Sequence, residues 1–225
     1  MQKFSDKQIE ELVKNEYAIL NQFYLERISS ISKGNPRIAL MASKIAKESN
    51  RLDSIVDVSG IYKVCFEPIS KDLSKNYDEN LLKVFAIIHF LEYVDNTVTK
   101  TMNFVDEVFK ISSDIFWKEV NILYELEMVN WYENKIVKAS DQVLADYISY
   151  MLFFEKKELD LSKIFEDYFP QYKHKLINLV ESSNEINQSF VYGTMKEYAD
   201  RYWDYFQNER SEEDLFHFLD IFWYI

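Results

Sequence analysis

The stretch that decides the fold is SDIFWKEVNILYELEMVNWYENKIVKASDQVLADYISY, residues 113–150. Apolar residues recur in its first part at three- and four-residue spacing, as on one face of a helix. Strand-forming residues then flank the turn pair Glu133-Asn134, which predicts a short β-hairpin at about 129–138. Asp141 is placed to cap the helix that follows. With a short helix at 103–111 in front, the order helix–helix–hairpin–helix predicts a winged helix.

The rest of the chain is also patterned for helices. Residues 6–32 carry apolar positions at helical spacing, over two helices or one interrupted helix. Gly34-Asn35-Pro36 ends this segment, and a new helix starts at Pro36, where a missing N–H costs nothing. Residues 79–93 form a strongly apolar helix, and 161–225 are helical and aromatic. We therefore predict a mainly α protein; the alternative is a helical domain in which the hairpin is incidental.

Composition narrows the class of protein. The 225 residues include only three glycines and three prolines, which favours long helices with few tight turns. The formal net charge of −12 repels phosphate backbones and anionic lipid surfaces. Apolar runs are too short to span a bilayer, and the N-terminus lacks the pattern of a signal peptide. The single cysteine, Cys65, permits no internal disulfide, so we expect a cytoplasmic protein without a membrane partner.

Four segments are expected along the chain. They are a helical segment at 1–50, a linker of less regular structure at 51–78, a winged-helix domain at 79–158 and a C-terminal helical segment at 159–225. The last segment ends in DLFHFLDIFWYI, residues 214–225, without a cap or a polar tail. Because domain ends are usually polar and frayed, we expect the natural chain to continue or this end to meet a partner.

Motifs for catalysis are missing. A P-loop needs two glycines five residues apart, and the glycines at 34, 60 and 193 exclude both it and the G-x-G-x-x-G pattern. The histidines lie far apart in sequence, and Glu92 and Glu213 are within helical reach of His89 and His217. Acidic residues are common throughout the chain, so such pairs arise by coincidence. We predict no catalytic residue and no metal site, with Cys65 a small buried side chain.

The second helix of the predicted winged helix, 113–127, is poorly suited to DNA. It carries one base, Lys118, against four acids (Asp114, Glu119, Glu125 and Glu127). Groove-reading helices present Arg, Lys, Asn or Gln to base edges. The wing adds only two lysines, Lys135 and Lys138. DNA binding is therefore unlikely, and we expect this winged helix to pack against protein.

The segment ISKGNPRIALMASKIA, residues 31–46, places Arg37 in the first turn of a helix. The helix macrodipole disfavours a cation there unless an anion is nearby. Arg37 is expected to be exposed, pointing away from the apolar face of its helix. The alternative is an ordinary surface arginine at a helix start.

The sequence G-N-P-R-I-A, after ERISSISK and before LMASKIA, resembles the sensor-2 segment of AAA+ ATPases and the GxP motif of STAND NTPases. The resemblance covers roughly residues 5–175, and KIVKASDQVLADYI is similar to the wing and following helix of bacterial STAND ATPases. It implies that 1–50 is a helical lid over a nucleotide. Pro36 would pack near the adenine, Arg37 would approach the terminal phosphates, and Gly34 and Asn35 would shape the turn. ATP or ADP would bind only with a P-loop core of the same parent chain, which these residues lack.

The biology implied is an ATP-dependent signalling switch, and many bacterial members of the family act in defence against phage. The implied partners are the P-loop core and other proteins, with a homo-oligomer as a further option. The alternative from another class is a stand-alone winged-helix regulator, or a helical scaffold that binds protein without nucleotide.

Overall fold

A computed structural model describes residues 3–49 and 57–223 of the chain. It is mostly helical, with 77% helix and 5% strand, which confirms the mainly α prediction. The chain divides into two compact units, Met1–Ile69 and Ser70–Ile225, which are described separately below. Over the described ranges, no helix combines the length and the apolarity that crossing a membrane requires.

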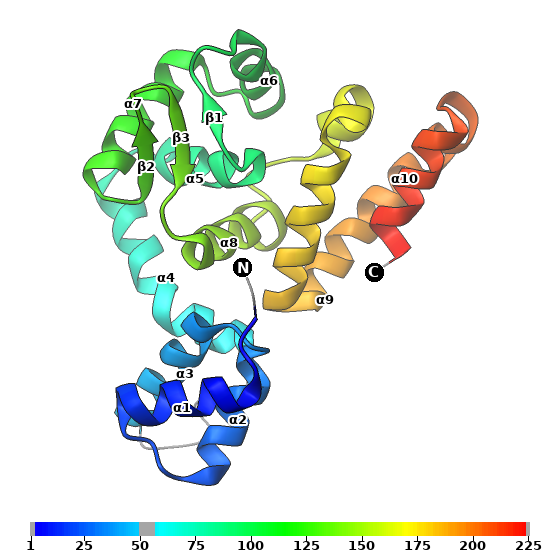
Figure 1. Ribbon diagram of the computed structural model, residues 1–225. Helices are drawn as coiled ribbons and strands as arrows, with labels where there is room; N and C mark the ends of the chain where they lie inside the picture. Colours follow the sequence, from blue (N-terminus) through cyan, green and yellow to red (C-terminus); the bar gives the residue numbers. More distant parts are fainter. Residues whose placement is uncertain (1–2, 50–56, 224–225) are drawn as a thin grey trace. The chain divides into compact units, whose positions relative to one another are not determined.

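The N-terminal unit is built from three short helices and the start of a fourth (Figure 1): α1 (Asp6–Tyr17), α2 (Gln22–Ser32), α3 (Pro36–Ser49) and α4 (Val58–Asn76). The first three helices pack against one another in every pairing. Their buried apolar side chains, among them Ile9, Leu25 and Ile28, form the core of this unit. Ser5 begins α1 with a reciprocal capping box to Gln8. Of the two alternatives left open for 6–32, the structure shows two helices, and the new start at Pro36 is confirmed.

Helix α4 occupies most of the range that was expected to be an irregular linker; residues 50–56 lie outside the described residues. Gly60 lies in the first turn of α4, where its N–H donates to the Asp57 carboxylate at 2.7 Å. Pro68 lies inside the helix and removes one backbone donor without ending it. The division between the two units follows directly, between Ile69 and Ser70. Gly60 therefore lies at the start of α4, and Pro68 lies at a turn of this helix that lacks one backbone hydrogen bond.

The C-terminal unit begins with a winged helix whose elements follow in the order α5 (Asn80–Leu91), β1 (Val94–Asp95), α6 (Thr99–Phe109), α7 (Ser113–Glu125), β2 (Val129–Tyr132) and β3 (Ile136–Ala139). The three strands form an antiparallel sheet in the order β1-β3-β2 (Figure 1). The predicted hairpin is confirmed as β2 and β3. Strand β1 was not predicted, because two residues in a polar loop give no strand pattern.

Helix α5 is the centre of this unit. Nine of its twelve residues are buried, and it contacts α7, α8, α9 and β3. Helix α8 (Gln142–Tyr150) starts at Asp141, whose carboxylate accepts from the Val143 and Leu144 N–H groups at 3.1 Å, and it continues into the π-helix η2 (Met151–Glu155). Ser112 caps α7, and its hydroxyl accepts from the Ile115 N–H. The Asp141 cap agrees with the sequence prediction.

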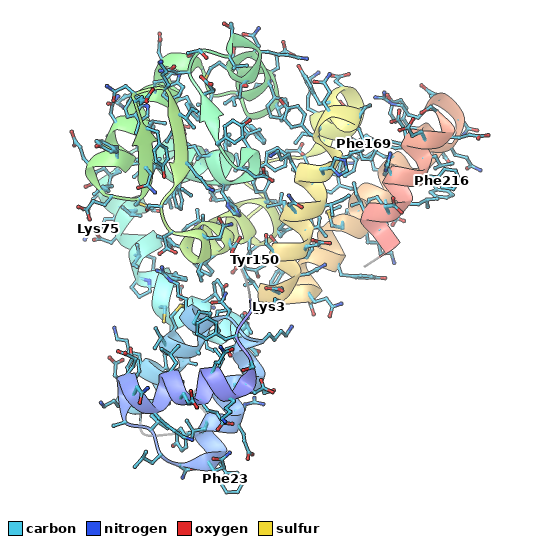
Figure 2. The ribbon with its side chains drawn as sticks, viewed as in Figure 1. Lys3, Phe23, Lys75, Tyr150, Phe169 and Phe216 are labelled. Carbon is cyan, nitrogen blue, oxygen red and sulfur yellow. The ribbon has the colours of Figure 1, made fainter. Side chains whose placement is uncertain are left out.

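The remaining elements form an aromatic assembly. They are the π-helix η3 (Ile164–Tyr168), the long helix α9 (Phe169–Glu209), which is interrupted at Asn187, and α10 (Glu212–Trp223). Rings from all three meet at Phe165, Phe206 and Phe218, with 4.2 Å between the centroids of the last two. Phe216, on the opposite side of α10, is 66% exposed and points into solvent (Figure 2). The helical, aromatic C-terminal segment is confirmed.

The β2–β3 turn allows a test of the hairpin. Glu133 and Asn134 have φ values of 50° and 53°, which a two-residue type I′ turn requires and which a glutamate adopts poorly. We expect Glu133→Asn with Asn134→Gly to raise the free energy of unfolding by about 0.5–1 kcal/mol. Glu133→Val should lower it, because a β-branched residue is strained at positive φ. Thermal unfolding followed by tryptophan fluorescence measures both; the same shift in both variants would contradict this turn.

Candidate functional site

The loop between α2 and α3 holds the residues singled out by the sequence. Gly34 is buried and has a φ of +80°, in the region that favours glycine. A Cβ at this position would lie 2.5 Å from the Phe4 carbonyl oxygen. The Phe4 N–H donates to the Gly34 carbonyl at 2.8 Å, so the N-terminal segment lies directly against the loop. Both the conformation and the close approach therefore require glycine.

Asn35 and Pro36 start helix α3. The Asn35 side-chain oxygen accepts from the Arg37 N–H at 3.0 Å and from the Ile38 N–H at 3.4 Å, as an N-cap does. Pro36 is the first residue of the helix, where it leaves no donor unmet. The first-turn N–H groups are thus used within the loop. An anion at this helix start would meet the side chain of Arg37 and not a row of free backbone donors.

Arg37 is exposed in the first turn of α3, as expected, and this turn contains no acidic residue. The side chains of Ile38 and Ala42, on the other side of the helix, are buried in the core of the unit. Packing therefore leaves the guanidinium at the surface of the N-terminal unit. The structure brings Gly34, Asn35, Pro36 and Arg37 into one loop, and their role with a nucleotide stays a prediction.

The other titratable candidates do not form a reactive site. No group of three or more metal-ligating side chains occurs in the described part of the chain. His217 lies 3.7 Å from Glu213, the carboxylate expected within its reach, and 3.7 Å from Asp220. Cys65 is half-buried, and burial raises the pKa of its thiol, which lowers the fraction of reactive thiolate at neutral pH.

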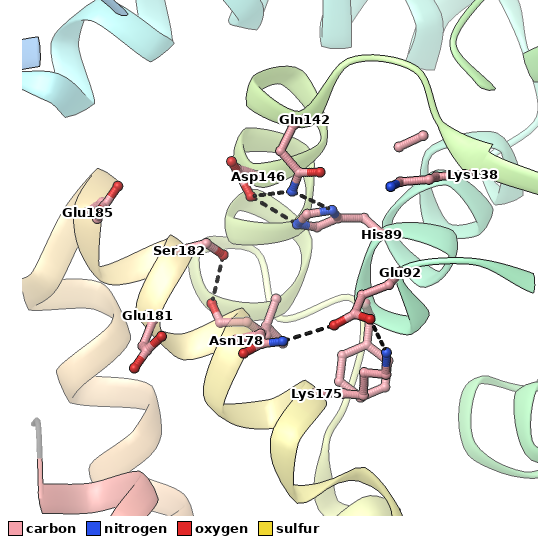
Figure 3. A pocket seen from close by; sticks show the side chains of 13 residues that line it. His89, Glu92, Lys138, Gln142, Asp146, Lys175, Asn178, Glu181, Ser182 and Glu185 are labelled. Carbon is pink, nitrogen blue, oxygen red and sulfur yellow. Dashed lines mark hydrogen bonds and ion pairs between the residues drawn. The ribbon is translucent and has the colours of Figure 1, made fainter. Parts of the chain in front are cut away.

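A polar cavity of about 480 Å³ lies in the C-terminal unit, among α5, β3, α8 and α9. Figure 3 shows its side chains arranged in two groups that bond within themselves. In the first, the His89 Nε2 lies 3.0 Å from the Asp146 carboxylate, and the Gln142 amide nitrogen lies 3.3 Å from the His89 Nδ1 and donates to Asp146 at 3.2 Å. With the ring proton on Nε2, this nitrogen donates to Asp146 and Nδ1 accepts from the Gln142 amide, whose second proton is donated to Asp146. Both ring nitrogens are therefore engaged, and neither is placed to act as a general base.

The second group is centred on Glu92, directly after α5. Its carboxylate accepts from the Lys175 ammonium at 2.5 Å and from the Asn178 amide at 2.9 Å (Figure 3). The hydrogen bond from Lys175, with the charge of that ammonium, outweighs partial burial and holds the pKa of Glu92 below its usual value. Glu92 also has a φ of 67°, which is uncommon for a residue with a side chain. The group ties the end of α5 to α9.

This cavity was missed by the sequence analysis, which paired His89 with Glu92. Its polar residues come from positions 89 to 185, and no local spacing brings them together. The i, i+4 pair Gln142 and Asp146 was the one local signal. His89 and Glu92 are both engaged within their own groups, so the geometry of these two groups supports a structural junction.

The exposed face of α7 holds the charges on which the DNA prediction rests, and that prediction stays a prediction. Lys118, its one base, has its ammonium 3.1 Å from the fully buried carboxylate of Glu119, although without hydrogen-bond geometry. In the wing, Lys135 lies 4.0 Å from Glu133. Most of the positive charge near this face is thus balanced locally.

Comparisons of the chain with known protein families, with curated proteins and with solved structures found no match.

The first prediction from these sites concerns Gly34. We expect Gly34→Ala to lower the free energy of unfolding of the N-terminal unit by about 2 kcal/mol or more, because both φ and the Phe4 carbonyl oppose a Cβ. Gly193→Ala, in α9, meets no atom within 4 Å and should stabilise by about 0.5–1 kcal/mol. Amide hydrogen exchange in α2 and α3 measures the first, since all four tryptophans lie beyond residue 69. Equal exchange in Gly34→Ala and the parent would contradict the tight approach.

The second prediction concerns the pH dependence of the Glu92 junction. A carboxyl group whose pKa is lowered by folding adds stability above its unfolded pKa of about 4.3 and loses it as the pH falls through the folded value. At pH 7, Glu92→Gln should cost about 0.5–1 kcal/mol, a figure reduced for solvent screening. The cost should shrink below pH 4. Glu181→Gln, in the same cavity without a recorded ion pair among the described residues, is the control; a pH-independent cost for Glu92→Gln would be the contrary result.

Proposed function

We propose that this chain is the lid and winged-helix portion of a STAND-type signalling ATPase. The observation that carries the proposal is the start of α3, where a glycine at positive φ, an Asn cap and a first-position proline hold Arg37 exposed in the first turn. This is the arrangement that the G-N-P-R resemblance implies for a lid over a nucleotide.

The order of the units supports the same proposal. A small helical unit precedes a winged helix along the chain, as in STAND proteins. In the proposed switch, ATP binds between a P-loop core of the parent chain and the helical unit. Arg37 meets the terminal phosphates, where a guanidinium forms charge-assisted hydrogen bonds, while Pro36 packs near the adenine. ATP in place of ADP then favours one arrangement of lid and winged helix.

In this proposal the chain contributes binding and switching but no catalytic group. The three glycines do not permit a phosphate-cradling loop, so hydrolysis requires the core. The partners are that core, other proteins and further copies of the parent chain. The implied setting is cytoplasmic signalling in bacteria, including defence against phage.

A second candidate is a helical scaffold or winged-helix regulator that binds protein without nucleotide. The acidic exposed face of α7 favours this candidate, because its negative charge repels DNA and because the first candidate gives this face no contact with the nucleotide. The two candidates differ in whether Arg37 has a function.

The test starts from the complete open reading frame. We expect this reading frame to encode a Walker A and Walker B core upstream of residue 1. A reading frame without such a core would overturn the proposal. In the complete protein, Arg37→Ala should weaken the response to ATP by about tenfold or more while leaving the fold intact. Limited proteolysis and size-exclusion chromatography at increasing ATP measure this response.

Lys44→Ala is the matched control. Lys44 is exposed further along α3 and pairs only loosely with Glu48, at 4.0 Å. An equal response in the Arg37→Ala and Lys44→Ala proteins would remove the role of Arg37. Residues 1–225 alone should not hydrolyse ATP, and turnover that is lost on Arg37→Ala would contradict the proposed need for a core.

A further inference from the structure

The exposed side of the winged helix carries an aromatic cluster. Trp117 and Trp131 stack with 5.8 Å between ring centroids and 18° between ring planes. Tyr124 meets Trp131 edge to face at 6.1 Å and is 53% exposed. Trp117 and Tyr124 come from α7 and Trp131 from β2, and these two elements contact each other. Two rings from α7 and one ring from β2 thus lie together.

Acidic residues share the side of α7 that carries two of these rings. Asp114, Trp117 and Tyr124 follow one another at i, i+3 and i+10, on one side of the helix, and Glu125 is next to Tyr124. Asp114 and Glu125 are exposed, and neither has a recorded ion-pair partner in the described part of the chain. We call Asp114, Trp117, Tyr124, Glu125 and Trp131 the acidic–aromatic patch.

The stability of the fold does not explain this composition. The indole Nε1 of Trp131 is buried and finds no acceptor among the described residues. An unmet buried donor costs folding free energy, which a phenylalanine at this position would avoid. Asp114 lies in the first turn of α7, where the helix macrodipole favours an acid, whereas Glu125 is at the other end of the helix, where it does not. The ring faces and the exposed carboxylates, and not the buried N–H, suit a ligand that stacks on rings and carries positive charge.

We propose that the acidic–aromatic patch binds an arginine-bearing segment of another protein. A guanidinium stacks on the faces of Trp and Tyr rings and pairs with carboxylates, and both kinds of group lie together here. The charge of the patch opposes nucleic acid and anionic lipid, which need a basic surface. The patch belongs to the C-terminal unit and does not involve Arg37, so its test is independent of nucleotide binding.

The test uses a synthetic peptide of six Arg-Ala repeats, titrated into the full 225-residue chain by calorimetry and by the fluorescence of its tryptophans. We expect binding that weakens with salt, because part of it is electrostatic. The matching Lys-Ala peptide should bind several-fold more weakly, since an ammonium lacks the planar stacking surface of arginine. The Glu-Ala peptide should not bind. Equal affinity for the Arg and Lys peptides would overturn the proposal, because bare charge would then suffice.

Variants separate the patch from the overall charge of −12. Tyr124→Ala with Asp114→Asn and Glu125→Gln should weaken binding of the Arg-Ala peptide about tenfold. The control is Tyr192→Ala with Asp200→Asn and Glu209→Gln, three exposed positions on α9 that give the same changes of residue type. It should weaken binding less than about twofold, as expected when only distant charge is lost. Equal losses in both triple variants would overturn the proposal.

Two further measurements keep the result interpretable. Tyr124→Phe retains the ring and should keep near parental affinity, whereas Asp114→Asn with Glu125→Gln tests the charges if the triple variant fails to fold. Duplex DNA, titrated into the protein without peptide, should not bind. DNA binding that is lost in the Tyr124→Ala, Asp114→Asn, Glu125→Gln variant would assign the face to nucleic acid and overturn the proposal.

Discussion

The burial of α5 is the constraint on which the C-terminal unit depends. A helix that is apolar on nearly all sides has no surface to present to water, so other elements must cover it. Helix α7 and strand β3 cover it within the winged helix, and α8 and α9 cover it from later in the chain. The winged helix is therefore part of a larger core. The two bonded groups at the cavity, around His89 and Glu92, form where the polar end of α5 leaves that core.

Turns and caps were predictable from the sequence, because local chemistry decides them. Gly34 supplies a positive φ, Asn35 and Asp141 supply side-chain caps, and Asn134 suits the positive φ of the hairpin turn, although Glu133 does not. The turn and the helix start at residues 34–37 were thus predictable from the sequence. A relation of this loop to a nucleotide stays a proposal, because it would depend on a domain outside these residues.

Features that depend on distant contacts were not predictable. Strand β1 is two residues long and exists because β3 offers Val137 as a partner for Val94. Helix α4 continues through Pro68, since the rest of the helix compensates for one missing bond. The cavity joins side chains that are almost one hundred residues apart. For β1 and the cavity the deciding interaction is tertiary, and local propensity gives only a weak expectation.

The division of the chain bears on the proposed switch. A switch that moves whole units needs each unit to keep its own core, and a joint at which bending breaks few interactions. The N-terminal unit has a separate apolar core, and the loop at residues 34–37 is fixed by contacts within that unit, from Gly34 to Phe4 and from Asn35 to the start of α3. The boundary falls between Ile69 and Ser70, one residue beyond Pro68, at which α4 lacks one backbone hydrogen bond. A helix is easiest to bend at such a turn, so a change in α4 would leave both the loop and the buried α5 intact.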